Sequence, residues 1–328
     1  MADVAARARV STQTVSRVAN NHQNVHPETR RRVLEVMRDI GYRPNLAARA
    51  LVTGKFGAIG VVTFDVAAHG NSRTLEAIVS ALQDTDYLVN LISVRSHTGS
   101  AVLRAFERLK SQAVDGIILN EAQVLDTPVA RFPPGMPLVI TDGDGGHPHP
   151  VVQTDHAEGV DLAVGHLLGL GHRTVWHLAG PPDSYPARRR VQAWRATLQA
   201  AGAPSPPVLH GDWSGESGYH VGRQLATEPD LTAVFCANDQ MALGAMKALH
   251  EAGRRVPEDV SVVGFDNLSE AAFFQPGLTT VDPDFDRIGR LCVTRLLEQI
   301  QERPPAVRRV QSVPPRLIVR DSTASPRH

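Results

Sequence analysis

The sequence predicts an α/β protein in which a small all-α head precedes a two-lobed body of doubly wound parallel sheets. Residues 1–52 contain short helices separated by turns, whereas from residue 56 short runs rich in Val and Ile alternate with helical stretches. Apolar strands that alternate with helices indicate parallel sheets covered on both faces. The 328 residues, 42% of them hydrophobic, suffice for two or three domains with sizeable cores.

Three helices are predicted in the head. The first covers residues 3–9, the second covers residues 11–20 with Ser11 as its N-cap, and the third covers residues 27–40. Gly41 ends the third helix, because glycine readily adopts the left-handed backbone that follows many helices.

Ten apolar runs in the body predict strands. They fall into two groups, before and after about residue 170, and this grouping predicts two lobes. Helical stretches such as residues 75–84 and 101–112 separate them. The predicted strands are residues 57–64, 87–93, 114–120, 137–142, 151–155, 174–180, 206–213, 233–239, 260–267 and 278–285.

The charge is unevenly distributed along the chain, although the net charge is zero. Residues 1–55 carry ten Lys or Arg and four Asp or Glu, a balance of +6, so the remaining residues carry −6. A basic head on an acidic body is expected when one end of a protein binds a polyanion. A chance imbalance in a short helical segment is the alternative.

The sequence indicates neither a secreted protein nor a membrane protein. The two cysteines, Cys236 and Cys292, provide no disulfide framework. The first ten residues lack the apolar stretch of a signal peptide, and no run approaches the ~18 apolar residues of a membrane-spanning helix. We therefore expect a cytoplasmic protein without a membrane partner.

The second predicted helix has an unusual exposed face. Val15 and Val18 lie on its apolar side. The opposite side carries small polar groups and one cation: Thr12, Gln13, Ser16 and Arg17. A face that only meets solvent is usually richer in Glu and Lys. Two short helices with such a second member form the layout of a helix-turn-helix, whose second helix enters the major groove of DNA.

The residue types on this face suit DNA recognition. Gln13 can pair with adenine through two hydrogen bonds, Arg17 can pair with guanine, and Thr12 can contact a base edge or a thymine methyl group. Small polar side chains also suit phosphate contacts, which position a protein on DNA without selecting a sequence. The candidates for phosphate contacts are Ser11, Ser16 and Asn20.

Two segments of the head, DVAARARVSTQTVSRVANN (3–21) and TRRRVLEVMRDIGYRPNLAARAL (29–51), together with the two-lobed remainder, resemble the lactose/galactose repressor family of bacterial transcription regulators. The resemblance implies a helix-turn-helix DNA-binding domain over residues 1–44 and a hinge helix over 45–55. It also implies an effector-binding and dimerisation domain over 56–328, with a two-lobed fold similar to periplasmic binding proteins.

The resemblance also assigns roles on the DNA side. Thr12, Gln13 and Arg17 correspond to the base-reading positions. A short helix is predicted near residues 46–52, and Asn45 and Ala48 belong to this DNA-binding hinge. Leu51 matches the apolar side chain that wedges into the minor groove at a central CG step. Without the family, a core position is the commoner role for such a leucine.

The head departs from the family pattern at two positions. Arg9 stands where the family usually has glycine, so that the turn either avoids positive φ or is strained. His26 replaces the usual serine before the third helix, which weakens that cap. The chain begins only two residues before Asp3, so the first helix could be shortened, and the competence of the head stays open.

Polar side chains of the body follow the predicted strands at their carboxyl ends, where ligands of such sheets bind. Asn238 and Asp266 each follow an apolar strand, and Arg190 lies at the start of a helix. By the resemblance these three would hydrogen-bond sugar hydroxyls, while Trp213 and Phe285 would pack on the apolar face of the ring. Taken singly, each has another explanation: helix caps for Asn238 and Asp266, core for Trp213, solvent exposure for Arg190.

The segments GDWSGESG (211–218) and ANDQMALGAMKAL (237–249) are particularly similar to the lactose-responsive branch of the family. Glu158 falls where that branch has an acidic ligand, although Asp155 competes for the role. Phe64 stands where a small hydroxyl residue is expected, and Pro283 where a hydrogen-bonding side chain is expected. A galactoside or another β-glycoside is the expected effector.

Catalytic and metal sites are not indicated. The loop DGDGGHPHP (142–150) contains histidines and aspartates, but it is rich in Gly and Pro and lacks an element that fixes ligand geometry. The segment from Asp282 begins like a calcium loop but has Arg287 at the glycine position and Val293 at the glutamate position. No nucleophile elbow, P-loop or dinucleotide fingerprint is present. We expect no enzyme activity, no cofactor and no metal.

The sequence therefore predicts a homodimeric transcriptional repressor that binds a pseudo-palindromic, double-stranded operator and is released allosterically by a small sugar. The polar tail RDSTASPRH (320–328) has no heptad leucines, which favours a dimer over a tetramer. Two alternatives stay open: a corepressor-dependent regulator that senses a purine, and a sugar-binding protein without a DNA function.

Overall fold

The structure, a computed structural model, describes residues 1–19, 24–42, 55–66, 68–83, 85–95, 98–120, 135–143, 149–302 and 310–327. The chain forms two compact units, residues 1–56 and residues 57–328, which we call the head and the body. Four residues predicted to bind DNA lie outside the described residues, as does the predicted hinge helix around them: Asn20, Asn45, Ala48 and Leu51.

The described residues of the head form three helices around a core of their own. Its helices are α1 (Ala2–Ala8), α2 (Thr12–Ala19) and α3 (Pro27–Asp39). Side chains from all three helices are buried together: Val4, Ala5, Ala8, Val15, Val18, Val33 and Met37. The predicted spacing of Val15 and Val18 therefore does place the apolar face of α2 in the core.

The turn between α1 and α2 is strained rather than regular. Arg9 ends α1 in the left-handed region, with φ 53° and ψ 49°. The Val10 N–H donates to the Ala5 carbonyl at 3.0 Å, which helps to close the turn. Of the two alternatives for this turn, the one with positive φ is the one observed.

The caps of the next two helices differ. The Ser11 hydroxyl accepts a hydrogen bond from the Thr14 N–H at 3.1 Å, as an N-cap serine should. His26 precedes α3 without any side-chain cap bond, consistent with the predicted weakening of that cap.

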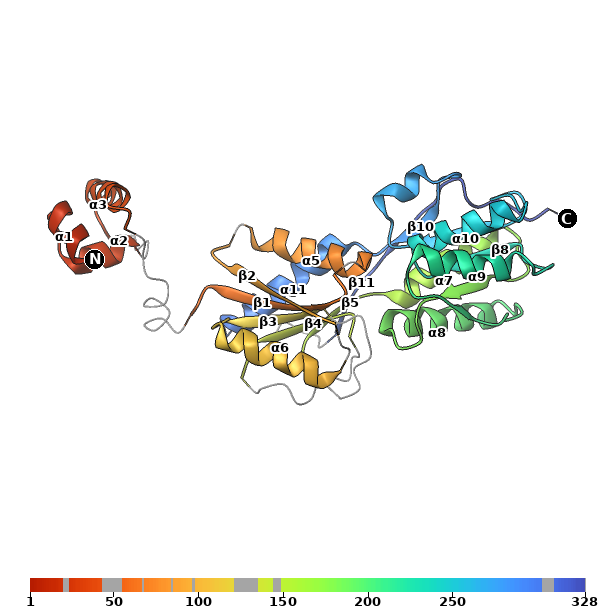
Figure 1. Ribbon diagram of the computed structural model, residues 1–328, viewed down its shortest axis with the longest axis horizontal. Coiled ribbons are helices and arrows are strands. Elements are labelled where there is room, and N and C mark those ends of the chain that lie inside the picture. Colours follow the sequence, from red (N-terminus) through yellow and green to blue (C-terminus); the bar gives the residue numbers. More distant parts are fainter. Residues whose placement is uncertain are drawn as a thin grey trace. The chain divides into compact units, whose positions relative to one another are not determined.

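The first lobe of the body contains a six-stranded sheet with the order β11-β5-β4-β3-β1-β2. All its pairings are parallel. The strands are β1 (Ala58–Phe64), β2 (Leu88–Val94), β3 (Gly116–Asn120), β4 (Leu138–Thr141), β5 (Val151–Thr154) and β11 (Val310–Val313). Helix α6 (Gly99–Ser111) packs on one face, and α5 (His69–Leu82) and α11 (Phe285–Ile300) pack on the other (Figure 1).

The second lobe contains another six-stranded sheet, with the order β12-β10-β9-β8-β6-β7. Its strands are β6 (Trp176–Ala179), β7 (Leu209–His210), β8 (Ala233–Cys236), β9 (Ser261–Phe265), β10 (Thr279–Asp282) and β12 (Arg316–Ile318). Only the β10–β12 pairing is antiparallel among the pairings of these strands. Its helices are α7 (His156–Gly169), α8 (Tyr185–Ala200), α9 (Gly215–Leu225), α10 (Asp239–Glu251) and the 3₁₀ helix η2 (Ser269–Phe273).

The two lobes are not continuous in the sequence. The chain passes from the first sheet to the second after β5, returns after β10 to form α11 and β11, and crosses again to form β12. The predicted grouping is confirmed for the ten predicted strands, but residue 170 is not a boundary between the lobes, because α7 joins the second lobe and α11 and β11 join the first. Local apolar patterning marks a helix or a strand but does not specify which sheet it packs on.

Among the helices of the described residues, none combines the length and the apolar character that a membrane crossing requires.

Relief of the strain at Arg9 should stabilise the head. We expect Arg9→Gly to raise its local free energy of unfolding by about 0.5–1 kcal/mol, because glycine adopts positive φ without a Cβ clash. Hydrogen–deuterium exchange of the α1 and α2 amides measures this change. Arg9→Ala is the control, since it removes the charge but keeps Cβ. Equal protection in the two variants would contradict the strain argument.

Candidate functional site

A cavity of about 310 Å³ lies between the two lobes of the body. Its walls come largely from residues at the carboxyl ends of strands and the starts of helices, as expected for open parallel sheets. The first lobe contributes Phe64, Asp65, Ala68, His69, Gly70, Asn71, Thr74, Asn120, Asp142, Thr154 and Phe285. The second lobe contributes Ser184, Pro186, Arg190, Asp212, Trp213, Ser214, Asn238, Gln240 and Asp266.

Five of the six residues predicted to bind the effector line this cavity: Arg190, Trp213, Asn238, Asp266 and Phe285. Glu158 does not. It lies in the first turn of α7 and is exposed, and its N–H donates to the Asp155 carboxylate at 3.1 Å. Asp155 is the N-cap of α7 and does not line the cavity either. The structure therefore does not bring Glu158 to the cavity with the other five residues.

The guanidinium of Arg190 is buried in the wall of the second lobe. It donates to the Ala237 carbonyl, and its Nη2 lies 3.6 Å from the Asp266 carboxylate. Its central carbon lies 3.6 Å from the centroid of the Phe265 ring, a cation–π contact. Because a buried charge needs partners, this arrangement fixes both the position of Arg190 and that of Asp266.

Asp266 has an unusual environment and an unusual backbone. Burial raises its pKa to about 7, against the opposing attraction of Arg190. Its φ of 104° lies in a region that L residues rarely adopt. Such strain persists only where the surrounding structure imposes it, and it is concentrated at functional sites.

Asn238 and Trp213 are joined in the same wall. The Asn238 Oδ1 accepts a hydrogen bond from the Met241 N–H at 3.0 Å, so that Asn238 caps α10, while its Nδ2 donates to the Trp213 carbonyl at 3.0 Å. Helix capping and a place in the cavity are thus combined in one residue. The indole of Trp213 lies against Gly180, where a Cβ would overlap its six-membered ring.

Polar side chains of the first lobe largely satisfy one another. The Asn120 Nδ2 donates to the Thr63 hydroxyl and to the Asn71 carbonyl, each at 3.2 Å. The Thr141 hydroxyl donates to the Asn120 Oδ1 at 2.6 Å. This buried network ties β1, β3 and β4 to the start of α5 directly behind the cavity.

Asp142 and His156 form a contact across the two lobes. Asp142 follows β4 and lines the cavity, and its carboxylate lies 3.4 Å from Nε2 of His156 at the start of α7. Burial lowers the pKa of His156, against the attraction of Asp142. Asp142 was not among the predicted ligands, although it follows a buried strand directly, as Asn238 and Asp266 do.

Acidic groups outnumber basic ones around the cavity. Among the described residues that line it, four are aspartates and Arg190 is the only arginine. Burial and the nearby Arg73 lower the pKa of His69, which is therefore neutral at pH 7. The cavity thus suits an uncharged ligand with hydroxyl groups better than an anion.

The exposed face of α2 carries the residues predicted to contact DNA. Thr12, Gln13 and Arg17 are exposed, and Ser16 is half-buried. The Ser11 hydroxyl accepts the capping hydrogen bond from the Thr14 N–H and lies 3.0 Å from the Thr14 hydroxyl. The face is therefore free of core contacts at the three positions that read bases by resemblance.

In the part of the chain that the structure describes, no group of three His, Cys, Asp or Glu residues could hold a metal ion. Asp144 and His147 of the Gly- and Pro-rich loop lie outside it.

Comparison with known proteins places these two units in one family. Residues 1–45 match the family described as bacterial regulatory proteins, lacI family, and residues 164–323 match a periplasmic binding protein-like domain. The lactose operon repressor of Escherichia coli (strain K12) is 36% identical over 331 residues, covering 99% of this chain and 90% of the relative. The chain belongs to the lacI family of bacterial regulatory proteins.

Other relatives and solved structures match over nearly the whole chain. The transcriptional repressor PurR of Pasteurella multocida (strain Pm70) is 33% identical, with 98% of both chains covered. The structure of the lac repressor dimer bound to operator and the anti-inducer ONPF superimposes with a TM-score of 0.87 at 34% identity, covering 98% of both chains. A complex of the regulator CelR with cellobiose gives a TM-score of 0.73 at 31% identity, with 98% of both chains covered. This lacI-family member thus combines a helix-turn-helix DNA-binding domain with a periplasmic-binding-protein-like fold.

Substitution of Gly180 should displace the indole of Trp213 from the cavity wall. We expect Gly180→Ala to make tryptophan fluorescence more accessible to acrylamide and to destabilise the body by about 1–3 kcal/mol, since the new methyl group overlaps the ring. Gly165→Ala is the control, because a Cβ there meets nothing within 4 Å. Unchanged quenching in Gly180→Ala would show that Gly180 does not seat the indole.

Proposed function

We propose that this protein is a homodimeric transcriptional repressor that binds a pseudo-palindromic operator and is released from it by a small sugar. A galactoside or another β-glycoside is the proposed effector. The observation that carries the proposal is the combination, in one chain, of the polar exposed face of α2 with a two-lobed cavity lined by Arg190, Trp213 and Asp266.

The side chains that line the cavity suit a sugar ligand. Vicinal hydroxyls suit a guanidinium paired with a carboxylate, as in Arg190 and Asp266, and the C–H face of a sugar ring suits the indole of Trp213. Phe285 lies on the opposite lobe and offers a second apolar surface. Relatives whose structures hold ONPF or cellobiose agree with this ligand class.

The head supplies the proposed DNA contacts. Thr12, Gln13 and Arg17 read bases in the major groove, and Ser11 and Ser16 contact phosphates. In the hinge, Leu51 enters the minor groove at a central CG step, and Asn45 and Ala48 contribute beside it. Two heads of a dimer then match the twofold symmetry of the operator.

Exposed apolar side chains support a dimer. Leu88 and Leu91 on the edge strand β2 are 64% and 45% exposed, and Phe273 on η2 is 83% exposed. Burial of such residues in an interface between two bodies removes apolar surface from water.

The protein is released from the operator because the sugar binds one arrangement of the lobes more tightly than the other. A sugar that contacts both walls of the cavity favours the arrangement of the lobes that it fits, and this preference lowers operator affinity through a coupling free energy of typically ~1–3 kcal/mol.

A purine corepressor is the second candidate, because PurR proteins are among the relatives. An indole also stacks on a purine, and Arg190 with Asp266 can pair with a base edge. The two candidates predict opposite signs: a sugar inducer lowers operator affinity, whereas a purine corepressor raises it.

The deciding experiment measures binding of a labelled, CG-centred palindromic operator at fixed salt, because phosphate contacts make the affinity salt-dependent. We expect a methyl galactoside or a related β-glycoside to lower the operator affinity about 5- to 150-fold. Galactose 6-phosphate should have no effect, since carboxylates outnumber cations around the cavity. Gln13→Ala is the control for specific binding and should lower the preference for this operator.

The outcomes separate the alternatives. Tighter operator binding with hypoxanthine or guanine would replace the sugar by a purine. Sugar binding without operator binding in any state would contradict the repressor.

The affinity for the sugar should depend on pH through Asp266. Its pKa of about 7 means that the carboxylate, which accepts hydrogen bonds from hydroxyls, becomes protonated as the pH falls. The affinity should therefore be about tenfold lower at pH 6 than at pH 8 and constant above pH 8, as measured by calorimetry. Asp266→Asn should bind weakly at every pH; a pH dependence that survives in this variant would assign the effect to Asp239, whose pKa burial raises to about 8.

A further inference from the structure

We propose that Arg320, in the C-terminal segment, is a positioning residue that holds the ligand-binding carboxylate of Asp266 in place through Asn267. The inference rests on the proposed sugar-binding function of the cavity. Arg320 itself does not line the cavity, so that its effect on ligand binding must pass through the turn at residues 266–268.

The turn that carries Asp266 is unusual because two consecutive residues have positive φ. Asp266 has φ 104° and Asn267 has φ 49°. Asparagine tolerates the left-handed region, but aspartate at 104° lies outside it. A backbone of this kind relaxes unless neighbouring groups impose it, and relaxation would move the carboxylate away from Arg190.

Two backbone N–H groups of the turn are held by hydrogen bonds to β10 and α10. The Asp266 N–H donates to the Val281 carbonyl at 2.8 Å, which extends the pairing with β10 by one residue. The Leu268 N–H donates to the Asp239 carboxylate at 2.7 Å. These bonds hold the residues before and after Asn267, but they leave the side chain of Asn267 to be fixed from elsewhere.

Arg320 fixes that side chain. Its Nη2 donates to the Asn267 Oδ1 at 2.9 Å, and its Nη1 donates to the Leu278 carbonyl at 2.6 Å. The planar guanidinium therefore links the turn to the start of β10 in one rigid group, which an ammonium cannot do with the same geometry.

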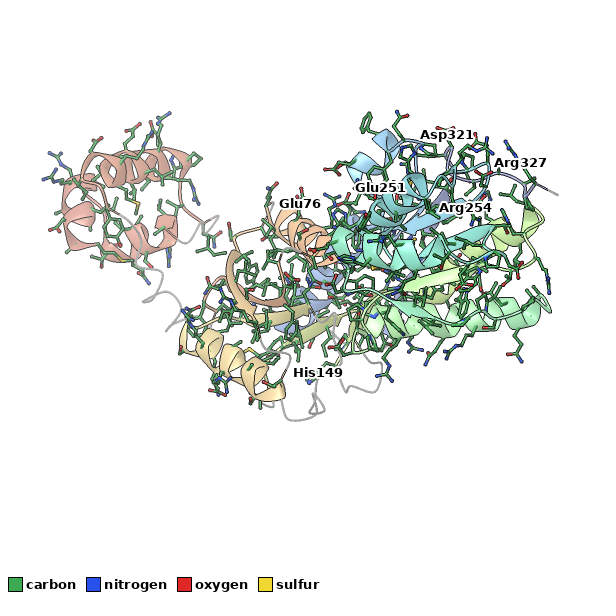
Figure 2. All side chains as sticks on the ribbon, turned by 45° about the vertical axis from the view of Figure 1, so that its right-hand side comes forward. Glu76, His149, Glu251, Arg254, Asp321 and Arg327 are labelled. Atoms are coloured by element: carbon green, nitrogen blue, oxygen red, sulfur yellow. The ribbon has the colours of Figure 1, made fainter. Side chains whose placement is uncertain are left out.

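The backbone from which the Arg320 side chain extends is also held in place by hydrogen bonds. The Arg320 N–H donates to the Thr279 hydroxyl at 2.9 Å. Two residues later, the buried Ser322 accepts from the Thr279 N–H at 2.8 Å and donates to the Val262 carbonyl at 2.6 Å. Figure 2, in which Asp321 and Arg327 are labelled, shows the C-terminal segment lying on the second lobe. Residues 320–322 are thus fixed to the sheet of the second lobe, and through Arg320 they fix the turn at residues 266–268 relative to that sheet.

The test measures sugar affinity of the full-length protein for the methyl β-galactoside or β-glucoside that binds the wild type. We expect Arg320→Gln to lower this affinity about tenfold and Arg320→Lys to restore part of it. Operator binding without sugar should not change. Arg327→Gln is the matched control, since Arg327 is an exposed arginine of the same segment, and its sugar affinity should equal that of the wild type.

A double-mutant cycle of Arg320→Gln with Asn267→Gly distinguishes a positioning role of Arg320 from a general loss of protein stability. Glycine keeps the positive φ but removes the Oδ1 that Arg320 contacts. We expect Arg320→Gln to cause little further loss of affinity in the Asn267→Gly background. The dependence of affinity on pH between 6 and 8 should also become weaker in Arg320→Gln, because a displaced carboxylate contributes less to binding.

Four results would overturn the inference. Full sugar affinity in Arg320→Gln, or an equal loss in Arg320→Gln and Arg327→Gln, would do so while leaving the proposed function intact. If Arg320→Gln lowered sugar affinity as much in the Asn267→Gly background as in the wild type, Arg320 would not act through Asn267. A wild-type protein that binds none of these sugars would contradict the proposed function, and this inference with it.

Discussion

The burial of one charged group, the guanidinium of Arg190, sets the main constraint on the body. A buried cation is tolerated only when it is paired and hydrogen-bonded, so that Asp266, the Ala237 carbonyl and the Phe265 ring must all lie close to it. Asp266 meets this demand only by adopting a backbone that L residues disfavour. The contacts that maintain this turn, from β10, α10 and the C-terminal segment, are in this sense consequences of Arg190.

The path of the chain gives the cavity two independent walls. Because α11 returns to the first lobe after β10, Phe285 lies opposite Trp213 although β10, the strand before it, belongs to the second lobe. Asp142 and His156 meet across the same gap. A ligand that touches both walls therefore contacts both lobes at once, and this is the physical requirement for a small molecule to bias one arrangement of the lobes over another.

Much of the site could be predicted because it obeys a local rule: polar residues that directly follow buried parallel strands converge at one edge of the sheet. Asn238 and Asp266 were found in this way. Glu158, which was selected by the resemblance, occupies an exposed position in the first turn of α7 and does not line the cavity. Asn120 was missed although it ends the buried strand β3 and the same rule applies to it, whereas nothing in the sequence around His69 distinguishes a cavity-lining side chain from a structural one. The DNA-binding hinge lies outside the described residues.

Four features could be read from local sequence alone: the helices of the head, the polar exposed face of α2, the alternation of strands and helices, and the family. These features follow from apolar periodicity, capping residues and short motifs, all of which act within a few residues along the chain. Only the tertiary structure decided that α11 and β11 join the first lobe and that the polar C-terminal segment buries Ser322 and places Arg320 beside Asn267. Such contacts join residues distant in sequence, and their partners are selected by the packing of whole sheets rather than by local pattern.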